Sequence, residues 1–287
     1  MAALRTAGHR VRLLAPAAPA RALLGSGAGE VESILPWDGP ETAAILAGER
    51  TGGPVGLALD AADVVVAFTR SESVVPPLRA RAARLLVHDP APPEGGPHAS
   101  FWLARALEPL AVRVEADPPP PLVFSEDERR EARARTRDLD NGFLAIHPGS
   151  GSPAKNWPAE RFSEVARRLS SGRPWLLVLG PAEGELAAWP GALVARDWPL
   201  RALGAALSRA SLFLGNDSGV AHLAAASGAP ALTLFGPTDP ALWAPVGRSV
   251  ATLRAPGDAL PSLSVDAVVA AALALRSAEP ASGPPSG

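Results

Sequence analysis

The segment from Phe213 to Asp239 constrains the fold more than any other part of the chain. It reads FLGNDSGVAHLAAASGAPALTLFGPTD, with a short apolar run, a helical stretch of small residues at Val220–Ser227 and a second apolar run at Ala231–Phe235. Apolar runs on both sides of a helix predict a strand–helix–strand unit with buried, parallel strands. Because strands and helices alternate along the rest of the chain as well, we predict an α/β fold.

The turn that precedes this helix has the composition of an anion-binding site. It reads Asn216-Asp217-Ser218-Gly219, and either Asp217 or Ser218 is suited to cap the helix by accepting a hydrogen bond from a first-turn amide. A helix N-terminus presents unpaired N–H groups and the positive end of the helix dipole, which favour an anion such as a diphosphate. Taken alone, the turn favours the simpler interpretation, an ordinary crossover in which it only caps its helix.

A second segment, Phe143–Arg168, places a lysine in a loop rich in glycine and serine. It reads FLAIHPGSGSPAKNWPAERFSEVARR, which predicts a strand to His147, a loop, and a helix that begins at Pro158. Lys155 is the only lysine in the chain, so every other cation among the 27 Lys+Arg is an arginine. A compact ammonium in such a loop is suited to bind a phosphate, the alternative being a solvated surface lysine.

The two segments are predicted to meet. In parallel sheets, ligands bind beyond the carboxyl ends of the strands, where both loops begin. We expect Lys155, the amides around Ser218 and Gly219, and the hydroxyl of Ser150 or Ser152 to converge on a diphosphate. A location of Lys155 and the Ser218–Gly219 turn on opposite sides of the domain would contradict this prediction.

The two motifs together resemble the carboxyl-terminal half of glycosyltransferase family 9, which contains the ADP-heptose:lipopolysaccharide heptosyltransferases. HPGSGSPAKNWP and GNDSGVAHLAAASGAPALTLFGPTDP carry the resemblance, which is strong from about Phe143 to Gly247. It implies an α/β GT-B architecture, with two Rossmann-like domains whose parallel sheets face across a cleft. It further implies an ADP-heptose-like nucleotide-sugar donor, no metal or other cofactor, and a lipid-linked glycan acceptor at the membrane surface.

The resemblance also assigns site residues. It assigns the family's phosphate-binding turn to four residues: Asp217, Ser218, Gly219 and His222. Glu183, in GPAEGE, resembles the acidic position that receives the donor's ribose hydroxyls. Thr238 and Asp239 match the GPTDP turn and are weaker candidates for contacts to the sugar or the diphosphate. Local structural roles stay open for several of these residues. His222 could be packed and bonded to a backbone carbonyl, and Glu183 could be favoured by the dipole of its helix. Thr238 and Asp239 could be ordinary turn residues.

The length of 287 residues predicts two domains, because it exceeds what one hydrophobic core usually holds. The run Pro118–Pro121 predicts a stiff, extended connector. We therefore predict an N-terminal, acceptor-side Rossmann-like domain at residues 1–115, a Pro-rich linker at 116–124, a C-terminal nucleotide-sugar-binding domain at 125–279, and a disordered tail at 280–287.

The first domain departs from the family pattern. Members begin with a strand, a Gly-Asp loop and a helix, and the loop aspartate is taken as the catalytic base. Met1 falls where that helix would run, so we predict an incomplete first domain and expect the base upstream of Met1. The first strand lies at the centre of a doubly wound sheet, so its loss leaves a gap or forces its neighbours together.

Composition excludes several other classes of protein. A formal net charge of −2 with scattered arginines argues against a nucleic-acid binder, and the absence of cysteine excludes disulfides, thiolate zinc sites and a cysteine nucleophile. No apolar run approaches the roughly 18 residues of a membrane span. We expect a cytoplasmic protein, at most peripheral on the inner face of the membrane.

Three functions stay open. The leading one is an inverting, heptosyltransferase-like enzyme that transfers a sugar from a nucleotide-diphosphate donor to lipopolysaccharide or another surface glycan. The first alternative is a non-catalytic nucleotide-sugar-binding remnant that has lost its base. The second is a GT-B nucleotide-sugar epimerase, which would convert the donor without an acceptor.

Overall fold

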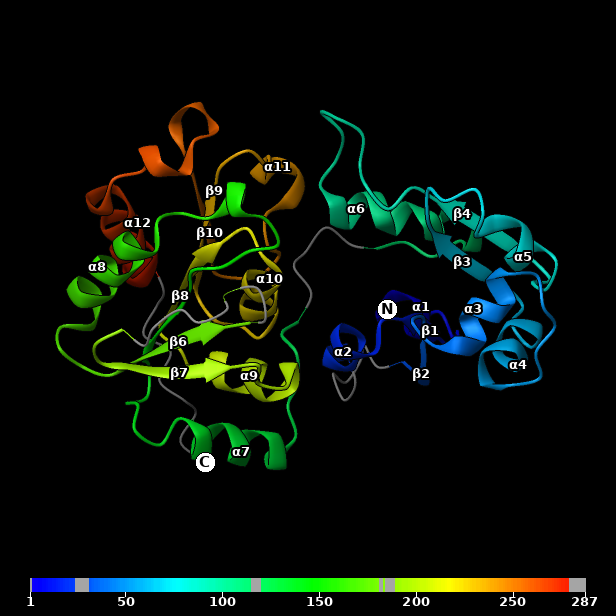
Figure 1. Cartoon of the computed structure of the whole chain (residues 1–287), viewed down its shortest axis with the longest axis horizontal. Coiled ribbons are helices and arrows are strands. Elements are labelled where there is room, and N and C mark those ends of the chain that lie inside the picture. The colour runs from blue at the N-terminus through cyan, green and yellow to red at the C-terminus, as the bar shows by residue number, and fades with distance from the viewer. Residues whose placement is uncertain (1, 24–30, 115–119, 181–182, 184–188, 279–287) are drawn as a thin grey trace. The chain divides into compact units, whose positions relative to one another are not determined.

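The chain divides into two compact units, Met1–Asp117 and Pro118–Gly287 (Figure 1). The computed structural model describes residues 2–23, 31–114, 120–180, 183 and 189–278. The expected tail at 280–287 lies outside the described residues, as do residues 116–119 of the expected linker. Each unit is described by itself.

The first unit is built from short elements. In chain order they are α1 (Ala2–Thr6), β1 (Arg12–Ala15), α2 (Ala17–Ala20), η1 (Arg21–Leu23), β2 (Ser33–Pro36), α3 (Pro40–Leu46), α4 (Pro54–Asp60), β3 (Val65–Phe68), α5 (Val75–Arg79), β4 (Leu85–His88), α6 (Ala99–Ala104) and the 3₁₀ helix η3 (Arg105–Leu110). Proline is the first residue of α3 and α4 and the second residue of α5, positions where its missing N–H is not needed by the helix.

Four strands of this unit form two separate parallel pairs. β1 pairs with β2, and β3 pairs with β4, while no pairing joins β1 to β3 among the described residues. Both pairs nevertheless pack against one core, formed by Ile45, Val55, Leu59 and Leu78. Phe68 at the end of β3 stays 46% exposed.

The second unit alternates longer helices with fully buried strands. Its elements are α7 (Glu126–Arg135), β5 (Leu144–His147), η4 (Pro153–Lys155), α8 (Ala159–Ser170), β6 (Trp175–Leu179), β7 (Ala192–Arg196), α9 (Leu200–Leu207), β8 (Leu212–Asn216), α10 (Gly219–Ala226), β9 (Ala231–Phe235), α11 (Pro240–Trp243), β10 (Val250–Arg254), η6 (Pro256–Asp258), η7 (Leu260–Ser262) and α12 (Val265–Ala278).

The six strands form one parallel sheet in the order β10-β9-β8-β5-β6-β7. The predicted strand–helix–strand unit is confirmed as β8-α10-β9. The chain extends the sheet from β5 through β6 to β7 and then returns to add β8 on the other side of β5, in direct register with it. This is the doubly wound order, in which ligands bind beyond the carboxyl ends of the two strands where the direction reverses. Here those strands are β5 and β8.

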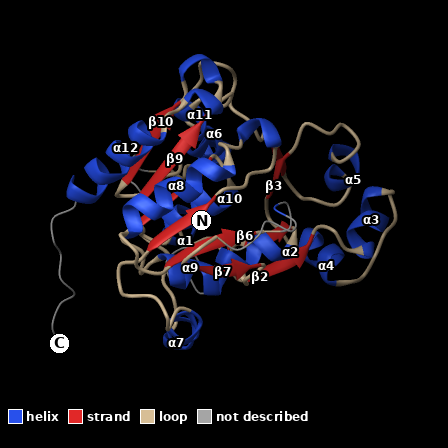
Figure 2. Cartoon of the chain, turned by 60° about the vertical axis from the view of Figure 1, so that its left-hand side comes forward, coloured by secondary structure: helices blue, strands red, loops and turns tan. Residues whose placement is uncertain are grey.

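Alternating side chains of the strands build two cores. Ile146 and Leu214 pack with Phe162 and Leu169 of α8 and with α12 on one face. Ala145, Phe213 and their neighbours pack with α9 and α10 on the other face. The strands thus lie between α8 and α12 on one side and α9 and α10 on the other (Figure 1), and Figure 2 draws these strands in red. Because both faces are covered, the strands read as continuous apolar runs.

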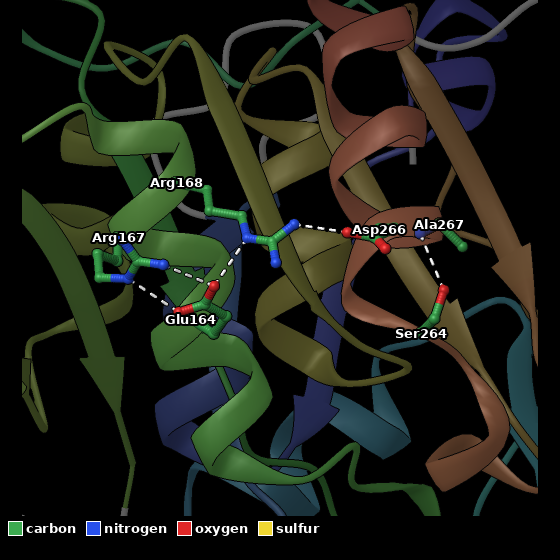
Figure 3. A network of polar contacts seen from close by, with 6 residues as sticks. All are labelled: Glu164, Arg167, Arg168, Ser264, Asp266 and Ala267. Atoms are coloured by element: carbon green, nitrogen blue, oxygen red, sulfur yellow. Dashed lines mark hydrogen bonds and ion pairs between the residues drawn. The ribbon is translucent and has the colours of Figure 1, made fainter.

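An exposed ion network joins the two helices of the first face (Figure 3). Arg168 on α8 donates from Nε to Glu164 at 2.7 Å and from Nη1 to Asp266 on α12 at 2.6 Å. Hydrogen bonds from Arg167 and Arg168 lower the pKa of Glu164 to about 2. Exposed pairs of this kind contribute little stability, so the apolar contacts beneath them carry the packing.

Candidate functional site

Asn216, the last residue of β8, holds the loop that carries Lys155. Its Oδ1 accepts a hydrogen bond from the Trp157 amide at 3.1 Å, and its Nδ2 donates to the Pro148 carbonyl at 2.7 Å. The side chain is fully buried. Both ends of the loop after β5 are therefore fixed to the end of β8. Asn216 was assigned no role from the sequence, because its importance depends on partners that lie 59 and 68 residues earlier in the chain.

Trp157 anchors the end of the same loop. Its indole is buried, its Nε1 donates to the Leu263 carbonyl at 3.2 Å, and its ring meets Phe162 edge-on at 5.0 Å. The loop therefore enters α8 in one defined direction, which limits where Lys155 can lie.

Lys155 pairs with Asp217 at the reversal point of the sheet. The Lys155 Nζ lies 2.9 Å from Asp217 Oδ2, and the hydroxyl of Thr238 donates to the same oxygen at 2.8 Å. The lysine side chain is 31% exposed and the aspartate side chain 9%. Lys155 is therefore not a freely solvated lysine. Three predicted site residues from three separate loops meet here.

The N-terminus of α10 adjoins this ion pair. Ser218 is the N-cap residue, with its hydroxyl accepting a hydrogen bond from the Ala221 amide at 3.3 Å, while the backbone amide of Asp217 is bonded to Leu234 in the sheet. Gly219 begins the helix and is exposed. The predicted proximity of Lys155 to the Ser218–Gly219 turn is confirmed, because its partner Asp217 is the residue before the cap. The roles of these residues in binding stay predictions.

The two loop serines differ. Ser150 is buried, and its Oγ lies 2.7 Å from both Asn156 Oδ1 and the Ser152 carbonyl while accepting from the Ser152 amide at 3.2 Å. Its single hydroxyl hydrogen can serve only one acceptor at a time, so Ser150 stabilises the loop internally. Ser152 is half-buried at the start of the 3₁₀ turn that carries Lys155.

Glu183 reaches across to the same loop from the end of β6. Its Oε2 accepts a hydrogen bond from the Gly180 amide, and its other oxygen lies over the backbone of Gly149. A Cβ at position 149 would come within 1.7 Å of that oxygen, so the Glu183 side chain can hold this position only beside a glycine. The carboxylate is thus placed beside the loop of Lys155, although the expected helix after Glu183 lies mostly outside the described residues.

His147, the last residue of β5, lies buried near Glu183. Its Nδ1 is 2.9 Å from the Val178 carbonyl, which accepts the bond when Nδ1 carries the proton. Burial lowers the pKa of His147, and the Val178 bond and the negative charge of Glu183 oppose the shift. The histidine is therefore neutral at neutral pH and shapes the floor of the site.

His222 and Asp239 lie at the edge of this arrangement. His222 is exposed on α10, which excludes the interpretation of a histidine packed in the core. Asp239 caps α11, because its Oδ1 accepts from the Ala241 amide at 3.0 Å, and it lies 3.5 Å from Arg254. The structure does not join Asp239 to the hydrogen bonds around Asp217. Its contacts are therefore those of an ordinary turn residue, the alternative that the sequence left open.

The charges of the site suit a phosphate group. The Lys155 ammonium and the N-terminus of α10, which both attract a phosphate, lie beyond the carboxyl ends of β5 and β8, and the Asp217 carboxylate offsets part of their positive charge. Within the described ranges, no group of three or more histidine, aspartate or glutamate side chains could hold a metal ion, and no helix is long and apolar enough to cross a membrane. A doubly wound sheet with a lysine and a helix N-terminus at its reversal point is typical of α/β domains that bind nucleotides.

Comparison with known proteins identifies the family. The model of glycosyltransferase family 9 (heptosyltransferase) matches residues 102–269, which is more than half of the chain. The chain belongs to this family.

The individual relatives agree with the assignment. The lipopolysaccharide heptosyltransferase 3 of Escherichia coli is 33% identical over 125 residues, which cover 38% of this chain and 37% of that protein. The chain spans less than half the length of the curated relatives it matches.

Solved structures confirm the α/β fold expected from the GT-B resemblance. The glycosyl transferase family 9 protein of Veillonella parvula is 21% identical and superposes with a TM-score of 0.75 over 96% of this chain and 91% of that one. The E. coli heptosyltransferase WaaC with ADP-2-deoxy-2-fluoro heptose gives 0.61 at 21% identity, over 93% and 92% of the two chains.

Proposed function

We propose that this protein is an inverting glycosyltransferase that transfers a sugar from an ADP-heptose-like donor to lipopolysaccharide or another surface glycan. The Lys155–Asp217 pair beside the N-terminus of α10 carries the proposal, because it offers a fixed ammonium and helix amides to one diphosphate. Membership of glycosyltransferase family 9 and a solved relative that holds an ADP-sugar support the choice of donor.

Lys155 is the proposed phosphate ligand, and Asp217 is proposed to position it. The ammonium has three hydrogens, of which one is directed to Asp217, so two remain for phosphate oxygens. A carboxylate repels a phosphate, so a direct contact between Asp217 and the diphosphate is unfavourable. Asp217 instead fixes the ammonium, and Thr238 fixes Asp217 through the same oxygen.

In the proposed reaction an acceptor hydroxyl oxygen attacks the anomeric carbon of the donor. The new glycosidic bond forms as the bond from that carbon to the diphosphate oxygen breaks, and the hydroxyl proton passes to a general base. The departing ADP takes the bonding electrons. Lys155 and the amides of α10 stabilise this growing charge, and loss of one such group typically lowers the rate about a hundred- to a thousandfold.

Glu183 is proposed to receive the ribose hydroxyls of the donor. Its carboxylate is fixed by the Gly180 amide and lies beside the Lys155 loop. A carboxylate at this place can accept two hydroxyl bonds from a ribose, as in other doubly wound nucleotide-binding domains. The acceptor is proposed to be lipid-linked and presented at the membrane surface, in keeping with the lipopolysaccharide heptosyltransferases among the relatives.

Isothermal titration with ADP tests the site. Lys155→Ala should raise the Kd for ADP about ten- to a hundredfold, because it removes a charged hydrogen bond. The matched control is Arg137→Ala, which removes an exposed cation of the same unit whose one ion pair among the described residues, with Asp138, is 3.8 Å long. Unchanged ADP affinity in Lys155→Ala would contradict the site.

Release of ADP from ADP-heptose separates the three functions. Release that requires a lipopolysaccharide-core acceptor supports the transferase. Binding of ADP without release, at high protein concentration and with acceptor, supports the non-catalytic alternative. Conversion of the donor without any acceptor supports the epimerase.

A further inference from the structure

A cavity of about 570 Å³ lies near the amino ends of β5 and β8, whereas the proposed donor site lies beyond their carboxyl ends. Asn141 precedes the amino end of β5 and Arg209 precedes the amino end of β8, whereas Lys155 and Asp217 follow the carboxyl ends of these strands. The remaining wall comes from α7, α9 and the segment before α7. The lining residues are Leu122, Phe124, Arg129, Arg133, Asn141, Ala205, Ser208 and Arg209.

Three guanidinium groups contribute to this cavity. Arg133 forms an ion pair with Glu126 on α7. In the described part of the chain, neither Arg129 nor Arg209 forms an ion pair with a carboxylate. The nearby Glu128 is committed to Arg201 at 2.6 Å. The three arginines carry three positive charges, and Glu126 offsets one of them. The excess of about two positive charges matches the charge of a dianion.

Arg209 is held in place by neutral partners. It donates from Nη1 to the Thr136 hydroxyl and from Nε to Asn141 Oδ1 at 3.4 Å. Burial lowers the pKa of Arg209, and the positive charge of Arg133 adds to this effect. Like charges around a hollow repel one another, so a bound anion would relieve an unfavourable interaction.

Three of the lining residues are apolar. Phe124 is buried, Ala205 is buried on α9, and Leu122 is half-buried. A cavity of this size is within the range that holds small organic molecules in proteins. Apolar walls with a few fixed polar groups suit a ligand that has a charged end and an apolar body.

We propose that this cavity binds a phosphomonoester that carries an apolar substituent. A phosphomonoester has close to two negative charges at neutral pH, which matches the excess charge of the three arginines. Planar guanidinium groups bind phosphate oxygens in pairs, so Arg129 and Arg209 offer two forks from two different elements. The substituent would lie against Phe124 and Leu122. The proposal does not depend on sugar transfer at the donor site.

Titration of the full chain with phenyl phosphate tests the proposal, in the Lys155→Ala background to weaken binding at the donor site. Arg209→Gln and Arg129→Gln should each raise the Kd about tenfold or more, whereas Arg137→Gln, an exposed cation outside the cavity, should leave it unchanged. Arg129 makes no side-chain hydrogen bond or ion pair among the described contacts, so its variant tests the site even if Arg209→Gln disturbs folding. Equal melting curves would identify correctly folded variants.

Two further comparisons use other probes. Inorganic phosphate should bind more weakly than phenyl phosphate, and phenol should not bind, because the site needs both the charge and the apolar body. Phenyl phosphate affinity that is indifferent to both arginine variants, or equal affinity for inorganic phosphate, would overturn the proposal.

A lipid headgroup presents the same chemistry as a soluble ester. Co-sedimentation with phosphatidylcholine vesicles, with and without phosphatidic acid, distinguishes the two sources. Sedimentation that requires phosphatidic acid and is lost in Arg129→Gln would identify a lipid phosphate as the ligand. Arginine-dependent binding of phenyl phosphate without sedimentation would identify a soluble ester.

Discussion

At the residue scale, Gly149 and Glu183 form a contact that neither motif alone predicts. The glycine lies in the Lys155 loop, and the glutamate oxygen occupies the space where a Cβ would be. The turn sequence HPGSGS suggests a flexible loop, whereas the structure shows that Gly149 leaves the space that the Glu183 carboxylate fills. The position of the carboxylate thus depends on the absence of a side chain 34 residues earlier.

Gly149→Ala should therefore displace Glu183. The carboxylate is the far end of a flexible side chain and can move away from the new Cβ, so we expect the unfolding free energy to change by about 0.5 kcal/mol or less, and ADP binding to weaken. Gly151→Ala is the matched control, because nothing lies within 4 Å of its Cβ among the described atoms. In a double-mutant cycle with Glu183→Ala the two effects should be non-additive. Additive effects would show that the two residues do not share this contact.

His147 should make the stability of the second unit depend on pH. Burial lowers the pKa of His147 below its usual value near 6.5, so the unfolded chain takes up this proton at a higher pH than the folded protein. Stability from this source is complete above about pH 6.5 and decreases as the pH falls towards the lowered pKa. His147→Gln should flatten this dependence in urea unfolding experiments. His9→Gln, at an exposed position, should leave it unchanged.

At the scale of elements, α10 joins stability to binding. Its residues are small and apolar, so it packs closely on the sheet through Ala221 and Ala224, both fully buried. Its N-terminus is directed to the site by the end of β8 and closed by Ser218. The same cap that completes the helix therefore sets the amides that the donor diphosphate is proposed to contact.

Ser218→Ala should lower the unfolding free energy by about 0.5–2 kcal/mol, because the Ala221 amide loses its side-chain acceptor and keeps only the Ser218 carbonyl at 3.1 Å. Ser218→Gly should cost only a few tenths of a kcal/mol, since glycine is a tolerated N-cap. Chemical denaturation measures both. Equal losses in the two variants would contradict a capping role for the hydroxyl.

Elements with strong local signals were predictable, and those without were not. The apolar run Ala231–Phe235 is a buried strand as expected, with the same bounds. By contrast, β10 at Val250–Arg254 is a partly exposed edge strand with a mixed sequence, and its pairing with β9 alone defines it. The short helices α4 and α11 were also not predicted, because each is one or two turns long and starts at a proline.

At the scale of the whole molecule, the second unit holds both large cores and every predicted site residue. The hydrogen bonds that join Asn216 to Trp157 and Trp157 to Leu263 lie entirely within the second unit. The first unit has a smaller core under two unjoined strand pairs. The two units therefore differ in how much apolar surface they can bury by themselves.

A fragment of residues 118–287 should fold and bind ADP by itself. Its six-stranded sheet is covered on both faces by its own helices, and Lys155, Asp217 and Glu183 are all retained. Cooperative thermal unfolding by circular dichroism and titration with ADP provide the measurements. A fragment that lacks cooperative unfolding would show that the second unit depends on the first.

The sequence by itself determined the α/β class, the strand–helix–strand unit and the two loops that carry the site, because apolar periodicity, glycine and capping residues act over a few neighbours. Only the tertiary structure decided that Asp217 pairs with Lys155, that Asn216 fixes the loop, that Ser150 bonds within it, and that Glu183 lies over Gly149. These contacts join residues brought together by the order of strands in the sheet. That order follows from the burial of both faces at once, which no local stretch of the sequence expresses.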